Sequence, residues 1–182
     1  MKKIMVIFMS VFLLAGCNIG VDFSNTPIKQ VEVFFNKYQT LDKDVLDDLD
    51  SVVAEEDQFN GEQRIAYRDL MKDSYQKLSY DIKEERIDGD KATVTVMIEV
   101  VDYSKILHDA NQHLADHSEE FTDDDGNYDV ILFNDYRLKQ LKKAKDMVQY
   151  TLDLHLTKEN DEWVIDELSS DDEDKIHGVY IH

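Results

Sequence analysis

Residues 88–101 read DGDKATVTVMIEVV, and this stretch decides the class of fold. The pair Asp88-Gly89 is typical of a tight β-hairpin turn. After the turn, apolar side chains alternate with other side chains, which predicts a strand with one face on a core and the other facing solvent or a cavity. The predicted buried face carries Ala92, Val94, Val96, Ile98 and Val100, and the open face carries Thr93, Thr95, Met97 and Glu99.

The same period of two appears on both sides of this stretch. Tyr80 and Ile82 alternate with polar residues before the turn, and a third strand is expected around residues 150–156. A charged turn over residues 159–162 separates that strand from a fourth over residues 163–168. Strands that come in local pairs favour an antiparallel sheet of two hairpins.

Three helices are expected before the first hairpin. Thr26 fits an N-cap followed by Pro27 at the first helical position, and Asn60 with Gln63 fits a capping box. Apolar residues recur every three or four positions, as on the buried side of a helix. The predicted buried sides are Ile28, Val31, Phe34, Phe35 and Tyr38; Val45, Leu46, Leu49, Val52 and Val53; and Ile65, Tyr67, Leu70, Met71, Ser74, Tyr75 and Leu78.

Two more helices are expected between the hairpins, over residues 104–120 and 128–147, with an acidic loop over residues 123–127. Ser170 and Glu173 predict the capping box of a last helix, which Gly178 would end. The order of elements therefore predicts a single α+β domain over residues 26–182, with N-terminal helices packed on a four-stranded antiparallel sheet.

The N-terminal residues indicate an export signal. Lys2 and Lys3 precede an apolar run over residues 4–14, which is too short to cross a bilayer comfortably. The next residues, Leu14-Ala15-Gly16-Cys17, resemble the lipobox of bacterial lipoproteins. The resemblance implies cleavage between Gly16 and Cys17, with a diacylglyceryl group on the Cys17 sulfur. Residues 1–16 would then be a signal peptide, and residues 17–25 a lipid anchor and tether.

Composition limits the partners. The chain has 20 Lys and Arg against 40 Asp and Glu, for a formal charge of −20. This excess of acid excludes nucleic acid as a partner, because phosphate backbones are bound by basic surfaces. It also means that attachment to the bilayer depends on the lipid at Cys17. The expected location is the extracytoplasmic face of the cell membrane.

Three stretches carry a further resemblance. PIKQVEVFFNKY over residues 27–38, ERIDGDKATVTVMIEVVDYSK over residues 85–105 and LTKENDEWVIDELSS over residues 156–170 resemble surface lipoproteins of Gram-positive bacteria. The last stretch is similar to the closing hairpin of the nuclear-transport-factor-2-like, or cystatin-like, cone fold. This resemblance implies a curved sheet wrapped on helices, with a pocket at its mouth, and it implies no catalytic residues.

Metal sites are weakly indicated. His113 and His117 lie four residues apart, hence on one helical face, with Asp109 and Glu120 within a turn. Two imidazoles and a carboxylate could hold Zn²⁺ or Ni²⁺, but a solvated helix face explains the pattern better. The acidic residues 123–129 suggest a calcium loop. With Gly126 at the sixth position of an EF-hand, however, Phe121 and Leu132 fall where oxygen ligands are required. We expect no metal and no cofactor.

The expected function is a non-enzymatic module that binds a protein, a peptide or a small ligand. The less apolar side of the sheet is one candidate surface, and several aromatic residues could either line a pocket or pack in the core. The alternatives are a hydrolase or isomerase on the cone scaffold, and a pheromone released from residues 10–16 of the leader. The sheet positions are Thr93, Thr95, Met97, Thr151 and His155; the aromatic residues are Tyr67, Tyr75, Tyr80, Tyr103, Tyr150 and Trp163.

Overall fold

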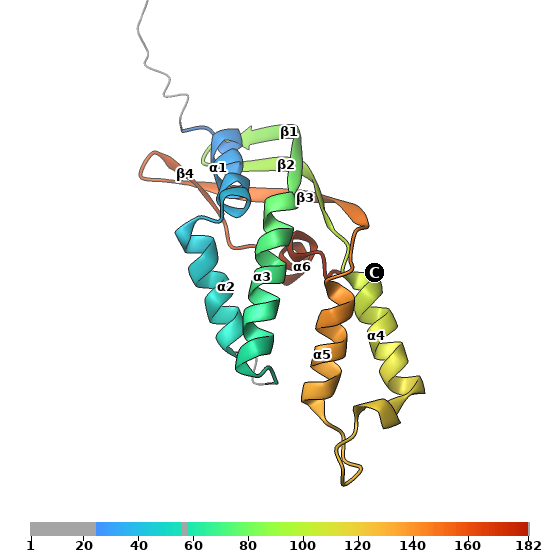
Figure 1. The fold of residues 1–182 in the computed structure, drawn as a ribbon. Coiled ribbons are helices and arrows are strands. Elements are labelled where there is room, and N and C mark those ends of the chain that lie inside the picture. The colour runs from blue at the N-terminus through green and yellow to red at the C-terminus, as the bar shows by residue number, and fades with distance from the viewer. Residues whose placement is uncertain (1–24, 56–57, 182) are drawn as a thin grey trace, which may run out of the picture.

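The computed structural model describes residues 25–55 and 58–181, and in these ranges the chain forms an antiparallel sheet with helices on one side and below it (Figure 1). Two pairs of helices, α2 with α3 and α4 with α5, extend side by side away from the sheet. The elements are α1 (Pro27–Thr40), α2 (Lys43–Glu55), α3 (Gly61–Lys77), β1 (Ser79–Asp88), β2 (Lys91–Val101), α4 (Ser104–Asp116), the 3₁₀ helix η1 (Ser118–Phe121), α5 (Val130–Leu141), β3 (Met147–Glu159), β4 (Glu162–Ile165) and α6 (Ser170–His177).

The predicted α+β class and the four-stranded antiparallel sheet are confirmed. The strands lie in the order β1-β2-β3-β4, so each strand pairs with the next one along the chain. Asp88 pairs with Lys91, which leaves Gly89 and Asp90 as the two-residue loop of the first hairpin. Gly89 has a φ of 61°, a left-handed conformation that glycine adopts without steric cost.

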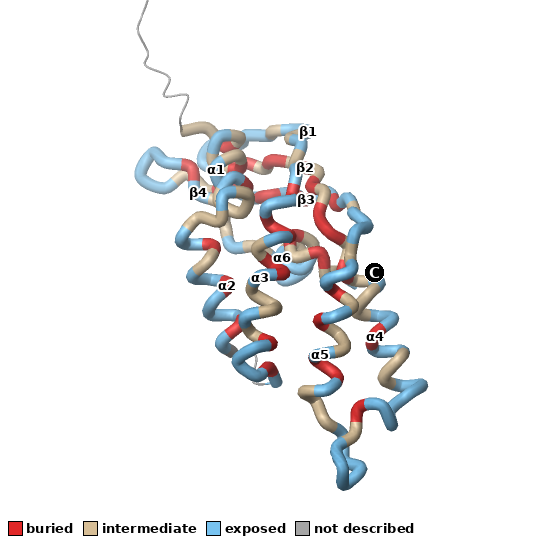
Figure 2. Tube along the Cα trace, viewed as in Figure 1, coloured by how far each residue is buried: buried red, intermediate tan, exposed pale blue. Residues whose placement is uncertain are grey.

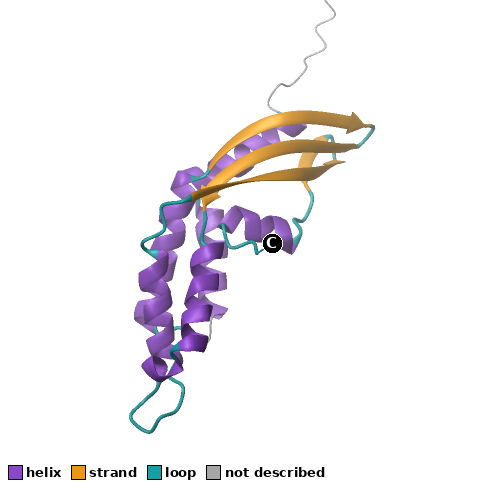
Figure 3. Cartoon of the chain, turned by 90° about the vertical axis from the view of Figure 1, so that its right-hand side faces the viewer, coloured by secondary structure: helices purple, strands orange, loops and turns teal. Residues whose placement is uncertain are grey.

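The buried face of the sheet is the one that the alternation predicts. Val94, Val96 and Ile98 have no exposed surface, and their side chains pack with those of α1 and α6. Figure 3 shows the curved strands with helices behind and beneath them. We call this packed region the sheet core. Its buried members are Val31, Phe35, Leu78, Ala92, Val94, Val96, Ile98, Val100, Tyr150, Leu152, Leu154, Leu156, Trp163 and Ile176.

A second packed region lies among the helices below the sheet, where buried positions line the inner sides of α2, α3 and α5 (Figure 2). We call it the helical core. It begins at the last residue of β2, Val101, and continues through Tyr103 into the helix pairs. Its buried members are Val45, Leu49, Val53, Leu70, Met71, Tyr75, Val101, Tyr103, Leu138 and Leu141.

Several predicted boundaries are wrong. The strand expected over residues 163–168 is β4, which begins at Glu162 and ends at Ile165. The helix expected over residues 128–147 is α5, which ends at Leu141, and Met147 instead opens β3 by pairing with Val101. Strand β3 therefore begins before Tyr150, which is the first residue of the predicted alternation. The helix expected to reach residue 120 ends at Asp116, where His117 leaves the helical conformation. Ser169, and not Ser170, caps α6 by accepting from the amide of Asp172.

Two residues predicted to be buried are exposed. Ile65 on α3 retains 64% of its surface and Val52 on α2 retains 56%. A helix touches its neighbours along a narrow stripe, so apolar residues at the margin of a predicted stripe remain in solvent. The capping box of Asn60 and Gln63 and the N-cap at Thr26 are confirmed.

The N-terminal end of the described chain is held against the second hairpin. The side-chain amide of Asn25 donates to the carbonyl of Asp161, and its oxygen accepts from the amide of Trp163. The folded body therefore includes Asn25. The leader, Gly16, Cys17 and the rest of the tether lie outside the described residues. Among the described helices, none is both long and apolar enough to cross a membrane.

Candidate ligand-binding groove

Two adjoining cavities lie beside α3, the first among α1, α2, α3 and α6 and the second between α3 and the pair α4–α5. The first has a volume of about 370 Å³ and the second about 220 Å³, and Tyr67, Met71 and Val179 line both. Their walls come from the ends of α1 and α6, from α2 and α3 on one side, and from α4 and α5 on the other. We call the two neighbouring cavities together the groove, and their combined volume is in the range of small-molecule sites.

The first cavity is aromatic and acidic. Tyr38, Tyr67 and Tyr75 line it together with aliphatic side chains, and its three charged side chains are all carboxylates. The complete lining is Tyr38, Val45, Asp48, Leu49, Val52, Tyr67, Met71, Tyr75, Glu173, Asp174, His177 and Val179.

The second cavity is more apolar, and its one charged side chain is Arg137. The Arg137 guanidinium lies 5.4 Å from the ring centroid of Phe59 and 5.9 Å from that of Phe133. Cation–π contacts of this kind hold the guanidinium against the wall. The remaining lining is Phe59, Tyr67, Leu70, Met71, Tyr103, Leu107, Leu141 and Val179.

A pair of ionisable groups lies in the wall of the first cavity. The hydroxyl of Tyr75 is 3.0 Å from Nδ1 of His177, which joins α3 to α6. Burial raises the pKa of Tyr75 well above its ordinary value, and nearby Tyr38, Tyr67 and Asp48 add to the effect. Burial lowers the pKa of His177, although Asp174 opposes this shift. Both side chains are therefore neutral near pH 7.

Tyr38 is the second phenol of this wall, and its ring packs edge-on against Tyr75 with centroids 5.0 Å apart. Burial raises the pKa of Tyr38 to about 12, and the charges of Asp48 and Glu173 contribute further. Neither tyrosine is thus an activated nucleophile or a base matched to neutral pH. The arrangement is suited to holding a ligand more than to moving protons.

The sheet positions proposed from the sequence do lie on the open face, where they pair with one another. The Thr93 hydroxyl is 3.2 Å from Nδ1 of His155, and the Thr95 hydroxyl donates to Asp153 over 2.5 Å. Thr151 is exposed and Met97 is half-buried. These cross-strand pairs stabilise the sheet surface itself.

The candidate metal residues come together only in part. The rings of His113 and His117 are 4.6 Å apart, and Nε2 of His113 is 3.1 Å from Glu120. His113 also stacks on Tyr136, and these contacts do not include Asp109. Within residues 25–55 and 58–181, no group of three or more His, Cys, Asp or Glu side chains is arranged to hold a metal ion.

In the acidic loop over residues 123–127, the first carboxylate accepts hydrogen bonds from the backbone of the loop itself. Asp123 accepts from the backbone amides of Asp125 and Asn127, and these bonds lower the pKa of its carboxyl group. The loop is closed by the bridge between Thr122 and Tyr128. Its geometry is that of a self-capped turn.

Sequence reasoning singled out some of the groove residues but not the groove. Of the aromatic candidates, Tyr67, Tyr75 and Tyr103 line it, whereas Tyr80, Tyr150 and Trp163 pack in the sheet core. The acidic wall residues Asp48 and Glu173 belong to helices far apart in the sequence. An available signal was the excess of tyrosine on the predicted helices, but only the arrangement of the helices brings these side chains together.

Comparisons with known proteins give one solved structure and no family. No family model matches the chain, and no curated protein matches it. The chain is similar to the crystal structure of a candidate lipoprotein, YcdA, from Bacillus subtilis, with a TM-score of 0.42 and 15% sequence identity. The similarity covers 81% of this chain and 46% of the other, so this chain spans less than half the length of that protein.

Proposed function

We propose that the protein is a lipoprotein of the extracytoplasmic face of the cell membrane and that its folded domain is a non-enzymatic ligand-binding module. In this proposal residues 1–16 are removed as a signal peptide and Cys17 becomes the acylated N-terminus. Residues 17–25 are the anchor and tether, and residues 26–182 are one domain. The domain belongs to the cone class of cystatin-like folds, which the antiparallel sheet on helices supports.

The groove is the observation that carries the binding function. It lies beside α3 among the helices, is lined mainly by apolar and aromatic side chains, and has a few charged groups at defined places. These are the properties of sites that hold small molecules. The raised pKa of Tyr75 keeps its hydroxyl protonated near pH 7, so that it can form a hydrogen bond with a ligand.

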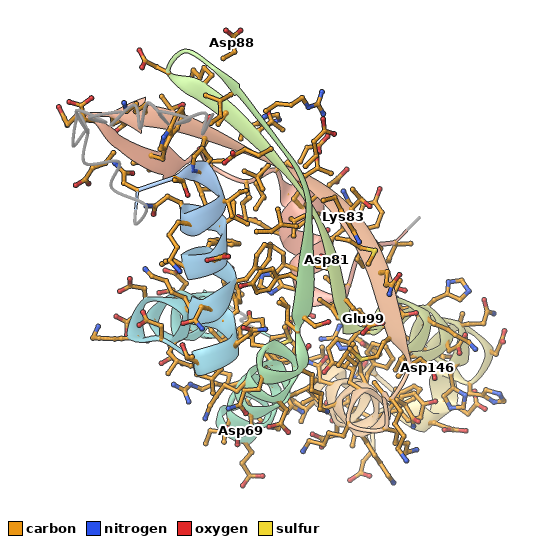
Figure 4. The ribbon with its side chains drawn as sticks, turned by 90° about the horizontal axis from the view of Figure 1, so that it is seen from above. Asp69, Asp81, Lys83, Asp88, Glu99 and Asp146 are labelled. Carbon is orange, nitrogen blue, oxygen red and sulfur yellow. The ribbon has the colours of Figure 1, made fainter. Side chains whose placement is uncertain are left out.

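The arrangement of the domain also suits a tethered binding module. Asn25, where the described chain begins, is bonded to the second hairpin beside Asp161. The helical core begins at the other end of β2, at Val101, which pairs with Met147. Figure 4 shows the two ends of the sheet, with Asp88 at one and Asp146 near the helices at the other. A lipid attached before Asn25 would thus leave the groove directed away from the bilayer.

Metabolic labelling with palmitate tests the anchor. We expect label in the wild-type chain and none in Cys17→Ser, because the thiol is the site of lipidation in this proposal. Gly16→Ala is the matched control, since it keeps a small residue before the cleavage point and leaves the thiol in place. Label in Cys17→Ser, or a mature protein that begins with Met1, would contradict the lipoprotein assignment.

A further inference from the structure

We infer that the groove takes an organic cation with an apolar tail, that is, an alkylammonium-type ligand, whose cationic head sits in the first cavity and whose tail extends into the second. This inference rests on the proposed binding function and specifies the chemistry of its ligand. It is argued from the charges, the aromatic residues and the connection between the two cavities.

The charges of the first cavity are unbalanced. Asp48, Glu173 and Asp174 line it without a single Lys or Arg, and among the described residues none of the three is in an ion pair. The rest of α2 behaves differently. Asp44 pairs with Lys37, Asp47 with Lys43 and Asp50 with Arg68, so these carboxylates, which do not line the cavity, each have a cationic partner.

An unpaired carboxylate beside a partly enclosed cavity favours a positively charged occupant. Asp48, Glu173 and Asp174 are exposed, so salt screens their attraction for a cation and should weaken it as the ionic strength rises. The formal charge of −20 adds to this preference, because it attracts cations to the molecule and repels anions.

The aromatic residues specify the kind of cation. Tyr38, Tyr67 and Tyr75 line the same cavity as the carboxylates, with Met71 between the two cavities. Aromatic rings attract a cation through their quadrupoles, and they favour an alkylated ammonium, which loses less hydration on entry than a metal ion or a bare ammonium. A cavity of about 370 Å³ is also larger than a metal ion requires.

The second cavity sets the orientation. It borders the first at Tyr67, Met71 and Val179, which line both cavities, and its wall is apolar apart from the phenol hydroxyls and Arg137. The guanidinium of Arg137, held over Phe59, repels a second cation from this half. The cationic head is thereby directed toward Asp48 and Glu173, and an alkyl tail would bury its methylene groups against Leu70 and Leu141.

Three probes with one alkyl chain and different charges test the inference. Hexyltrimethylammonium, hexan-1-ol and hexyl sulfate are each titrated calorimetrically into the full chain as purified from cells in dodecyl maltoside, with titrations into detergent alone subtracted. We expect the cation to bind about tenfold more tightly than the alcohol, and the sulfate to bind more weakly than both.

Variants test which side chains produce the preference for the cation. Asp48→Asn with Glu173→Gln should weaken binding of the cation about tenfold and leave binding of the alcohol within about twofold. The matched control is Asp47→Asn with Asp171→Asn, which removes two charges from the same two helices outside the cavity and should change neither. Tyr67→Leu should weaken binding of the cation about threefold. Tyr67→Phe keeps the aromatic ring and should bind the cation as tightly as the wild type does.

The outcomes separate this inference from the proposed function. Equal affinity for the cation and the alcohol, or equal losses in the Asp48→Asn, Glu173→Gln variant and in its control, would overturn the cation assignment while the groove still bound a ligand. If none of the three probes bound, both the cation assignment and the binding function of the groove would be overturned. Palmitate labelling would report on the anchor independently in either case.

Discussion

The sheet core and the helical core are built from similar residues but are packed differently. In the sheet core, Val94, Val96, Ile98 and Leu156 have no exposed surface. None of its buried members lines either of the two cavities. In the helical core, by contrast, Leu49, Met71 and Tyr75 are buried and yet border open space.

The difference follows from how the two regions are assembled. A sheet that pairs every neighbouring strand presents a continuous face, and α1 and α6 fill the space against it. Below the sheet, α3 packs against both α2 and α5. The groove is the space left on the two sides of α3, toward α2 and α6 and toward α4 and α5. In the proposed function, stability is thus concentrated in one region and binding in the other, as is common where a rigid scaffold positions a site.

The same substitution in both regions should show this contrast most strongly. Leu154→Ala in the sheet core should lower the free energy of unfolding by about 4 kcal/mol, because the fully buried site cannot collapse around the lost methyl groups. Leu49→Ala should cost about 2 kcal/mol, because the new space opens into the groove, where water can enter. Urea denaturation followed by circular dichroism measures both. Equal costs would show that the helical core is packed as completely as the sheet.

The comparison also explains which parts of the fold could be predicted. The buried positions of β2 and β3 were predicted correctly, because one face of a strand is fixed once the alternation is seen. Val52 and Ile65 were placed wrongly, because a helical stripe does not show where one neighbour ends and solvent begins. The groove could not be predicted, since it depends on the distance between helix pairs that no local pattern encodes.

A glycine between the two regions should give the next largest effect. Gly178 ends α6 with a φ of 71°, and a Cβ there would lie 2.0 Å from the carbonyl oxygen of Val101. Gly178→Ala should therefore cost about 3 kcal/mol through strain and displacement of that backbone. Gly126→Ala is the control, because its φ of 81° is also positive but nothing lies within 4 Å of its Cβ position. We expect about 1 kcal/mol there, from strain alone. Thermal denaturation would show similar losses in the two variants if the contact with Val101 were unimportant.

Acid should weaken the helical core before the sheet core. The pKa of His177 is lowered in the folded state, so the unfolded chain binds more protons at this site, and stability falls as the pH drops below about 6.5. At pH 5.5 the loss is at most about 1.4 kcal/mol, and less because Asp174 favours the charged imidazole. His177→Gln should remove this part of the pH dependence between pH 7.5 and 5.5. An unchanged slope in the variant would assign the dependence to other groups.

The smallest change in stability should come from filling the groove. Val52 is 56% exposed at the margin of the first cavity, so Val52→Phe can direct its ring into the groove and should alter the free energy of unfolding by less than about 0.5 kcal/mol. Val96→Phe in the sheet core should cost about 2 kcal/mol, because no space is available for the ring. Val52→Phe should nevertheless weaken binding of hexyltrimethylammonium, since the ring and the ligand compete for one volume. Unimpaired binding in a variant of normal stability would show that the ligand does not occupy the first cavity, and it would remove the link between loose packing and function on which the comparison depends.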